Sequence, residues 1–454
     1  MLPRGHASFI AGLDADMIPE RRWLRAQLPH LVSDARMAFT CPPPCFYNVP
    51  TDDPISQSLF AFHKFEEIVK DSAGIAWCTG SGWVMRRTAL AEIGGFPAKS
   101  LTEDLLCGKL LLGRGWRSAY IQETLQWGLV PDTYHAHIRQ RTRWSTGGVQ
   151  AGLIMKLCLF GDLSRHLNGW QRAYSFWYLF QNASATLKTL EVLKTMLMLI
   201  FGWPTTVFAD KRQLASLVRV AALGHIANFV RQCLIAYVNG YAASSREIFC
   251  LYFMNTCTSI RRGSDWASEA KQTVDFALDH WRTFVLPTRV GGRLTAFCAI
   301  FPSTGSLPDE LNERKKALRA PFCKRLQSVL IKDGGVIHLL VSLGFMFGFF
   351  LNIKRAYMLY PSDLEACFLY LLPRVFWVSA MWPAYTVAFL RPFWYATFPP
   401  TMQDREHLLE RDATKVAYPK DESKLPKSPI RGLGLELVNT VSAVWAFGLL
   451  IGTW

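Results

Sequence analysis

The sequence predicts an α/β domain in its first third, followed by an α-helical region that spans a membrane. Residues 1 to about 165 alternate short apolar runs with amphipathic segments, as α/β domains do. The second half contains three long stretches with almost no charge, each close to the roughly 20 residues that cross a bilayer. Of the 454 residues, 50% are hydrophobic and only 19% are charged, against about 25% charged in ordinary soluble proteins.

The composition and the charge exclude several classes of protein. The apolar content is too high for a disordered chain. Lys and Arg number 50 against 35 Asp and Glu, a net charge of +15, which suits nucleic acid, anionic lipid or a phosphate-bearing substrate. The apolar stretches favour the last two, so we expect no nucleic-acid partner. The 11 cysteines have no regular spacing, which argues against a secreted disulfide framework.

Three segments of the first domain read as strands. The run Phe9–Leu13 is apolar and ends in acidic residues, which predicts a buried strand with a site at its carboxyl end. Residues Trp77–Met85 are mostly small and apolar and read as strand-like, and Trp116–Ile121 is a further strand candidate. These strands would form the sheet of the α/β domain.

Three other segments read as helices. Apolar residues recur with a spacing near 3.6 over Ser56–Lys70, which predicts an amphipathic helix. Residues 86–93 read as a short helix that stops at Gly94-Gly95. A further helix opens at Thr102, a plausible N-cap residue with acidic residues in the following turn.

Long apolar stretches dominate the second half. Val336–Ile353 and Leu437–Trp454 contain no Lys, Arg, Asp or Glu, and Ala366–Leu390 contains only one charged residue. Leu187–Ala209 and Leu214–Val238 are weaker candidates, because each carries charged residues. We therefore expect five spans.

The charges between these spans predict their orientation. Ser306–Gly335 contains seven Lys and Arg residues and Arg391–Gly434 contains eight, whereas Asn352–Glu365 contains two. Positively charged loops stay in the cytosol. This rule places both basic loops, and with them the first domain, on the cytosolic side.

The first candidate motif is Asp14-Ala15-Asp16, directly after the predicted strand Phe9–Leu13. Two carboxylates at this spacing on a turn can hold one divalent ion, and a hard cation with oxygen ligands can bridge a diphosphate. The same pattern is also common by chance in loops, so alone it carries little weight.

The second candidate motif is Thr102-Glu103-Asp104. A carboxylate at the start of a helix, on the floor of a pocket, can accept a proton from a sugar hydroxyl. The alternative is an ordinary N-cap with an acidic first turn, which taken alone is the better interpretation.

The third candidate motif is the segment Gln140–Trp144, with the sequence QRTRW. Arginine presents a fork of donors suited to phosphate oxygens. Tryptophan offers a flat apolar face that packs on a sugar ring. The alternative is an amphipathic helix at a membrane interface, where basic and aromatic residues also mix. Both readings are compatible with one helix.

The order of these motifs resembles that of the family 2 glycosyltransferases, most closely the cellulose synthase branch of membrane-embedded β-glycan synthases. LDAD, WCTGSGWVMRR, LTED, LLGRGWRSAYI and HIRQRTRW follow one another before the spans. The family motifs DxD, TED and QxxRW match at Asp14/Asp16, at Thr102–Asp104, and at Gln140, Arg143 and Trp144. The resemblance is close over residues 9–150 and looser over Ala296–Leu311, which is similar to the family's gating-loop region.

The resemblance implies a partial GT-A fold in a cytosolic domain, a UDP-sugar donor and inversion at the anomeric carbon. By the same resemblance, Asp14 and Asp16 hold Mg²⁺ or Mn²⁺ against the diphosphate. Asp104 is the general base, beside Glu103 and Thr102. The residues implied beside the donor and the growing polysaccharide acceptor are Gln140, Arg143, Trp144, Trp77, Cys78, Gly80 and Ser81.

The chain also departs from the family pattern. Members normally have further strands before DxD, with another aspartate motif that helps to bind uridine, and here the chain begins about a dozen residues before Asp14. Two alternatives to a polysaccharide synthase therefore stay open. One is a truncated, catalytically silent membrane subunit or fragment, and the other is a non-processive transferase to a lipid acceptor. Accessory subunits are possible but unknown.

The expected organisation is a multi-pass membrane protein of the plasma membrane or the Golgi. Six regions follow one another: a partial GT-A domain, interfacial and transmembrane helices, a cytosolic interfacial and gating-loop region, two transmembrane helices, a cytosolic linker and a C-terminal transmembrane helix. Their boundaries are 1–165, 166–240, 241–335, 336–390, 391–433 and 434–454.

Overall fold

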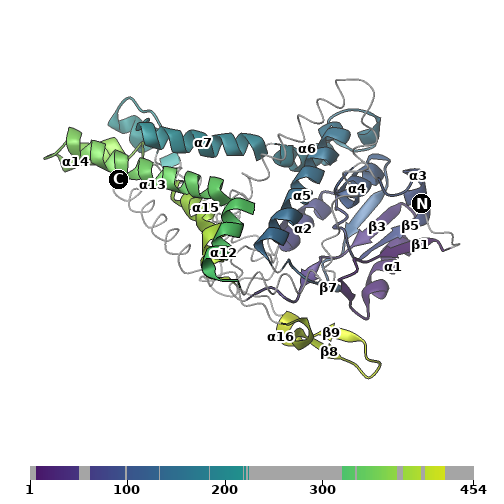
Figure 1. The fold of residues 1–454 in the computed structure, drawn as a ribbon. Coiled ribbons are helices and arrows are strands. Elements are labelled where there is room, and N and C mark those ends of the chain that lie inside the picture. The colour runs from purple at the N-terminus through teal and green to yellow at the C-terminus, as the bar shows by residue number, and fades with distance from the viewer. Residues whose placement is uncertain are drawn as a thin grey trace, which may run out of the picture. The chain divides into compact units, whose positions relative to one another are not determined.

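The structure is a computed structural model of the 454-residue chain (Figure 1). It describes residues 7–50, 62–97, 100–131, 133–183, 185–217, 320–332, 335–375, 382–399 and 404–424, with isolated positions between 219 and 227. The chain divides into two compact units. The first comprises Met1–Thr186, Ser268–Ala320 and Thr401–Lys427, and the second comprises Leu187–Ala267, Pro321–Pro400 and Ser428–Trp454.

A four-stranded mixed sheet forms the centre of the first unit. Its order is β1-β5-β3-β6, with β1 antiparallel to β5, β5 antiparallel to β3, and β3 parallel to β6. The bounds are Phe9–Gly12 for β1, Met37–Cys41 for β3, Trp83–Arg86 for β5 and Arg117–Tyr120 for β6. The strands predicted at 9–13 and 116–121 are confirmed. Within the predicted segment 77–85, the strand begins only at Trp83.

Helices cover this sheet (Figure 1). Those that pack on it are α1 (Trp23–Ser33), α2 (Glu67–Ser72), α3 (Arg87–Glu92) and α4 (Glu103–Gly113). Beyond α4 lie α5 (Tyr134–Ile154) and α6 (Gly169–Ala183), which pack on α4 and on each other. Helix α4 is apolar around most of its circumference because it is covered on two sides. Cys107 and Leu111 join the core of the sheet, whereas Leu105, Leu106 and Leu112 join a second core with α5 and α6.

Two of the three predicted helices are confirmed as predicted. Helix α3 is followed by Gly94 and Gly95, whose φ angles of 83° and 93° end it. Helix α4 begins after Thr102, although the Thr102 side chain makes no capping hydrogen bond. The predicted helix 56–70 begins later, with a π-helical turn at Phe62–Glu66 before α2, and its first residues, 56–61, lie outside the described residues.

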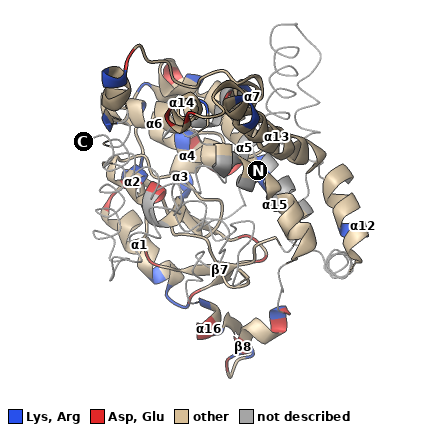
Figure 2. Cartoon of the chain, turned by 90° about the vertical axis from the view of Figure 1, so that its left-hand side faces the viewer, with Lys and Arg blue, Asp and Glu red and all other residues tan. Residues whose placement is uncertain are grey.

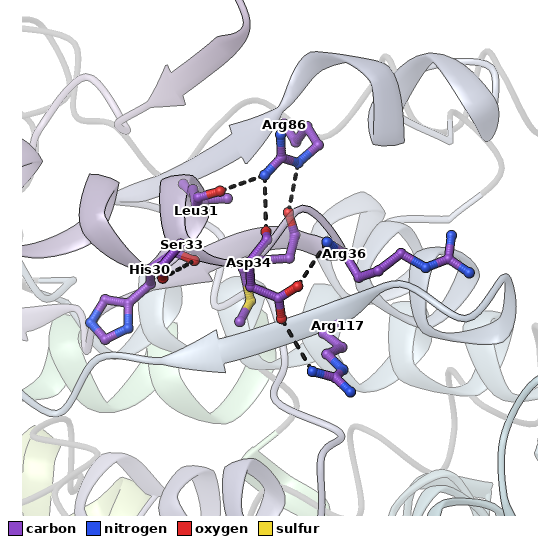
Figure 3. A network of polar contacts seen from close by, with 8 residues as sticks. His30, Leu31, Ser33, Asp34, Arg36, Arg86 and Arg117 are labelled. Atoms are coloured by element: carbon purple, nitrogen blue, oxygen red, sulfur yellow. Dashed lines mark hydrogen bonds and ion pairs between the residues drawn. The ribbon is translucent and has the colours of Figure 1, made fainter.

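Arg86 ties the end of α1 to the sheet (Figure 3). Its guanidinium donates hydrogen bonds to the carbonyl oxygens of Leu31, Asp34 and Met37, at the turn that leads from α1 into β3. The Asp34 carboxylate caps the same turn through the Arg36 N–H at 2.8 Å and pairs with Arg117 at 3.3 Å. One planar guanidinium therefore satisfies three carbonyl groups between the last turn of α1 and the start of β3.

A second sheet lies beside the Asp14–Asp16 turn. Its order is β2-β7-β4, with bounds Ile18–Pro19, Gln126–Gly128 and Cys45–Phe46. Against it packs a distant segment of the chain, the hairpin of β8 (Leu409–Arg411) and β9 (Ala417–Pro419) with α16 (Asp421–Lys424). Leu408 and Leu409 share an apolar cluster with Tyr47 and Trp127.

Ion pairs also hold this hairpin in the first unit, where α16 and the hairpin carry mixed charges (Figure 2). Arg21 pairs with Asp412 at 3.0 Å, and Lys424 reaches Glu20 at 3.7 Å. The region 391–433, expected to be a linker, thus contains an ordered element over residues 404–424 that belongs to the first unit. Its contacts are with residues about 280 to 400 positions earlier, which local sequence patterns do not encode.

The second unit is helical where it is described. Its helices are α7 (Ala185–Phe201, of which the first two residues fall in the first unit), α12 (Phe322–Gln327), α13 (Gly335–Leu359), α14 (Leu364–Leu371) and α15 (Trp382–Thr397). Val192, Leu199, Phe345 and Phe389 form part of its core. Inside the predicted stretch 366–390, Arg374 donates to the carbonyl oxygen of Gly202 at 2.8 Å.

Within the described ranges, α13 alone is long and apolar enough to cross a bilayer, judged by length and composition. In the predicted span Ala366–Leu390, α14 ends at Leu371 and a turn follows over residues 372–375, whereas α15 begins at Trp382. Residues 376–381 lie outside the described residues. The predicted span Leu437–Trp454 lies outside the described residues, as does most of Leu214–Val238.

Candidate active site

The Asp14-Ala15-Asp16 turn follows β1 at its carboxyl end. The Met17 N–H donates to the Asp14 carbonyl oxygen at 3.0 Å, which closes the turn. Asp14 and Asp16 are both accessible to solvent. Even so, the surrounding protein reduces the hydration of Asp14 and, with the charge of Asp16, raises its pKa from 3.8 to about 6. The pKa of Asp16 is raised as well, mainly by loss of hydration.

The Thr102–Asp104 turn is docked on helix α5. The Leu101 N–H donates to Oε1 of Gln150 at 2.8 Å, and both residues are buried. The Ser100 hydroxyl donates to the Gly147 carbonyl oxygen at 3.2 Å. A β-carbon on Gly147 would lie 2.6 Å from Thr102, so only glycine permits this contact. These contacts fix the start of α4 relative to α5.

Asp104 is the most strongly perturbed carboxyl of the site. Burial and the neighbouring charge of Glu103 raise its pKa from 3.8 to about 7. Its Oδ1 accepts the Leu105 N–H at 2.7 Å, and this bond and the charge of Arg143 act in the opposite direction. A carboxyl that changes its protonation state near neutral pH suits acid–base chemistry.

Helix α5 carries the third motif. Gln140 is buried, whereas Arg143 and Trp144 are partly exposed. Arg141 stacks on the Trp144 ring with its guanidinium carbon 4.6 Å from the ring centroid. The Nε atom of Arg143 is buried and has no hydrogen-bond partner among the described residues, which is costly unless a ligand oxygen completes it.

The three motifs converge on one site. The charges of Asp16, Glu103 and Arg143 all act on Asp14, and those of Glu103, Arg143 and Asp14 all act on Asp104. These residues come from the turn after β1, the start of α4 and the middle of α5. The fold thus brings together acidic and basic side chains that are up to 129 positions apart in the sequence.

The loop Trp77–Gly82 passes between these motifs. Gly80 has a φ of 95°, and a β-carbon there would lie 2.8 Å from Oδ2 of Asp104. Ser81 is buried and accepts the Asp14 N–H at 3.0 Å. Cys78 is also buried, and the thiol of Cys41 beside it, together with burial, raises its pKa. The loop therefore contacts both the Asp14 turn and Asp104.

Trp77 packs into a buried cluster of charges and aromatic rings. Lys70 Nζ lies 3.3 Å from the Trp77 ring centroid and 4.6 Å from that of Tyr178. Lys70 pairs with Glu67 at 2.6 Å, and both side chains are 0% exposed. Lys109 is also buried, which lowers its pKa to about 8, and it donates to Ser175 at 3.3 Å.

Two residues of the site were not predicted from the sequence. Gln126 is 0% exposed and donates to the Ser81 carbonyl oxygen at 2.9 Å. Arg405, at the start of the hairpin, carries a positive charge that lowers the pKa of Asp16. Neither belongs to a motif. Gln126 is one glutamine in a short apolar strand, and Arg405 lies in a charged segment that reads as a linker.

The donor set of the site fits a divalent cation bound together with a phosphate ligand. Asp14 and Asp16 offer accessible carboxylate oxygens, the donors that hard cations prefer. The protein reduces the hydration of both carboxylates and so raises their pKa values, and a bound cation would favour their ionised forms. Over the described ranges, no group of three or more His, Cys, Asp or Glu side chains is arranged to hold a metal. The remaining ligands would then come from a bound anion.

Comparison with known proteins finds a family model that matches part of the chain. Residues 10–230 match the family model described as "Glycosyl transferase family group 2". The catalytic subunit of "Cellulose synthase 1 (UDP-forming)" from Komagataeibacter xylinus is 32% identical over 148 residues, which are 30% of this chain and 20% of that protein. A UDP-forming cellulose synthase catalytic subunit from Dictyostelium discoideum is 32% identical over 167 residues, 36% of this chain and 15% of that protein.

A third relative, from Xanthomonas axonopodis pv. citri, is 29% identical over 160 residues, 34% of this chain and 22% of that protein. The aligned region thus spans about a fifth of the length of these relatives. The family match covers the turn after β1, the start of α4 and the motif on α5, all of which meet at the site described above. Residues 10–230 contain a GT-A-like domain with mixed sheets, and this domain is similar to the family 2 glycosyltransferases and is cellulose synthase-like.

Proposed function

We propose that the chain is a membrane-embedded, inverting glycosyltransferase that transfers glucose, or a related hexose, from a UDP-sugar to a growing β-linked polysaccharide. The observation that carries the proposal is the mutual electrostatic influence of Asp14, Glu103, Asp104 and Arg143 in one accessible site. The names of the relatives, which are UDP-forming cellulose synthases, favour a UDP-sugar and a β-glucan.

The donor side of the site is assigned to Asp14, Asp16 and Arg143. Family 2 glycosyltransferases generally use a divalent metal, and Mg²⁺ or Mn²⁺ is the proposed ion. When bound, such an ion offsets negative charge on the leaving diphosphate. The two aspartates would hold it from the turn after β1. The unpartnered Nε of Arg143 would donate to a diphosphate oxygen and stabilise the charge that develops there.

The acceptor side is assigned to Asp104, Gln140, Trp144 and the loop residues 77–80. The acceptor hydroxyl oxygen would attack the anomeric carbon of the donor as the bond to the diphosphate breaks and UDP leaves. The hydroxyl proton passes to the ionised Asp104 carboxylate. Trp144 would pack on the terminal sugar ring. Because Gly80 has no side chain, the loop passes close to Asp104 without covering Oδ2 with a β-carbon.

The membrane part of the proposal is supported by α6 and α13. Trp170 and Trp177 of α6 are 63% and 56% exposed, and exposed aromatic residues suit a membrane interface. Helix α13 has the length and hydropathy of a span. We propose a multi-pass topology with the transferase domain in the cytosol. An epitope inserted after Lys427 should be reached by antibody only after cells are permeabilised, and labelling of intact cells would contradict this topology.

Transfer of labelled glucose from UDP-glucose tests the function. Membranes that contain the chain, supplied with Mn²⁺ or Mg²⁺, should form an insoluble product that a β-glucanase digests. The Asp104→Asn variant should lose at least about 100-fold in rate, the usual scale of general-base catalysis. Asp71→Asn is the matched control, because Asp71 is also a partly buried carboxyl with a raised pKa but contacts Tyr120 on β6.

The same assay separates the alternative functions. Transfer from UDP-N-acetylglucosamine without transfer from UDP-glucose would reject the glucan assignment. A product of one sugar on a lipid, identified by mass spectrometry, would indicate a non-processive transferase. Neither transfer nor metal-dependent UDP binding by correctly inserted protein would indicate a silent subunit and would overturn the proposal.

A further inference from the structure

The inference concerns the contact between Ser81 and the backbone of Asp14. Strands β1 and β5 are antiparallel, and Gly12 pairs with Trp83 at the end of the ladder. Continued by two residues, this register places Asp14 opposite Ser81. The ladder itself stops at Gly12. Beyond it, the Asp14 N–H donates to the Ser81 hydroxyl at 3.0 Å, so that a side chain replaces the missing backbone partner.

Ser81 is itself held by buried groups from other elements. Its carbonyl oxygen accepts Nε2 of Gln126, from β7, at 2.9 Å. The next carbonyl, that of Gly82, accepts Nε1 of Trp23 at 2.7 Å and Nε2 of Gln27 at 2.9 Å, both from α1. Gln27, Ser81 and Gln126 are at most 2% exposed. The two peptide groups that follow Ser81 are therefore fixed from two directions.

Gly82 and the side chain packed against it further restrict the backbone next to Ser81. Its φ angle is 74°, a conformation that residues with side chains rarely adopt. A β-carbon at this position would lie 2.4 Å from the amide of Gln126. The amide thus packs directly on the glycine, and Ser81 can move only if β7 or α1 moves with it. The hydroxyl of Ser81 is a preorganised acceptor.

We propose that Ser81 is a positioning residue that fixes the Asp14–Asp16 turn in the conformation that binds a divalent cation with a nucleoside diphosphate, and that Gln126 holds Ser81 in place for this task. This inference rests on the proposed function, because it assigns Ser81 to the metal and diphosphate side of that site. In this assignment, Ser81 acts through its hydrogen bond to the Asp14 N–H and does not contact the acceptor. Gln126 becomes part of the site without touching a ligand.

The test compares Ser81→Ala and Gln126→Leu with Ser118→Ala in the full chain, purified in detergent. Ser118 is the matched control, because its partly buried hydroxyl donates to the Ala76 carbonyl oxygen at 3.0 Å in the same domain. The first readout is binding of UDP in the presence of Mn²⁺, measured by calorimetry. The second is hydrogen exchange of the Asp14 amide, which reports on its hydrogen bond without any ligand.

We expect Ser81→Ala and Gln126→Leu to weaken Mn²⁺-dependent UDP binding about five- to tenfold, the scale of one buried hydrogen bond. The Asp14 amide should exchange about tenfold faster in Ser81→Ala. Ser118→Ala should change neither readout. Equal UDP binding by all four proteins would overturn the inference and leave the proposed function standing. Absence of Mn²⁺-dependent UDP binding in the unsubstituted chain would instead overturn the proposed function, and the inference with it.

Discussion

Gly80 and Asp104 approach so closely that a β-carbon on the glycine would lie 2.8 Å from Oδ2 of the aspartate. Gly80 also has a φ angle of 95°, which disfavours any side chain. Gly80→Ala should therefore displace either the loop or the carboxylate of Asp104. We expect a loss of at least about tenfold in the rate of sugar transfer, because general-base catalysis depends on the position of the base.

Gly94→Ala is the control for the backbone effect. Gly94 also has a positive φ, 83°, but a β-carbon there would meet nothing within 4 Å. Both variants should lose stability through backbone strain, and only Gly80→Ala should lose activity out of proportion to the fraction of folded protein. Equal specific activities of the two folded variants would show that the contact with Asp104 is unimportant.

The raised pKa of Asp104 predicts the pH dependence of the reaction. A general base acts in its ionised form, and half of the Asp104 carboxyl groups are ionised at about pH 7. The initial rate of glucose transfer should therefore rise from pH 6 to pH 8 and level off above it. A rate that is constant between pH 5.5 and pH 8.5 would argue against Asp104 as the base.

The same shift predicts how Asp104 affects stability. Its pKa is higher in the folded protein than the ordinary 3.8 of an unfolded chain, so the folded state favours the protonated carboxyl. This contribution to stability is complete below about pH 3.8 and is lost as the pH rises to about 7. Asp104→Asn, which removes the ionisation, should raise the Tm by a few degrees at pH 8 and by less at pH 5. A lower Tm at pH 8 would contradict the sign of the shift.

Gln150 should be important for docking the Thr102–Asp104 turn on α5. Gln150→Leu leaves the buried N–H of Leu101 without its acceptor, which costs about 1–3 kcal/mol in the free energy of unfolding. Thermal unfolding should show the loss, and sugar transfer should fall because the turn carries Asp104. Gln171→Leu, which removes a partly buried bond to the Gly74 carbonyl oxygen, is the control. Equal losses of Tm in the two variants would count against a special role of Gln150.

Arg86 should stabilise the first unit more than its neighbour Arg117 does. Arg86→Lys cannot reach the carbonyl oxygens of Leu31, Asp34 and Met37 together, and we expect a loss of about 1–3 kcal/mol. Arg117→Lys alters only an exposed ion pair with Asp34, which contributes less than about 1 kcal/mol. Denaturant unfolding of the two variants measures the difference, and an equal effect would contradict the structure.

The parts of the fold that sequence reasoning predicted are those with local signals. Strand β1 is an apolar run that ends in acids, α3 stops at two glycines, and α4 opens with an acidic turn. Helix α1 carries weaker signals, since it contains Pro29 and has no acidic residue in its first turn. Its place is set by the bonds of Trp23 and Gln27 to Gly82, more than 50 positions later.

The candidate site was predictable as a set of motifs but not as a packed arrangement. Asp14, Asp104 and Arg143 follow from the order of three short patterns. The contact of Ser81 with the Asp14 backbone depends on the register of β1 against β5, and Gln126 depends on a second sheet. Arg405 depends on a hairpin that returns to the first unit from near the end of the chain. Such contacts arise from tertiary packing, on which local propensity has no influence.

The buried pair of Glu67 and Lys70 limits how this part of the protein can change during evolution. Removing either partner alone leaves a charge without compensation inside the protein, at a cost of several kcal/mol. Replacing both by apolar residues of similar size is far less costly. In related chains these two positions should therefore be exchanged together, and a lineage that loses one partner first passes through a less stable protein.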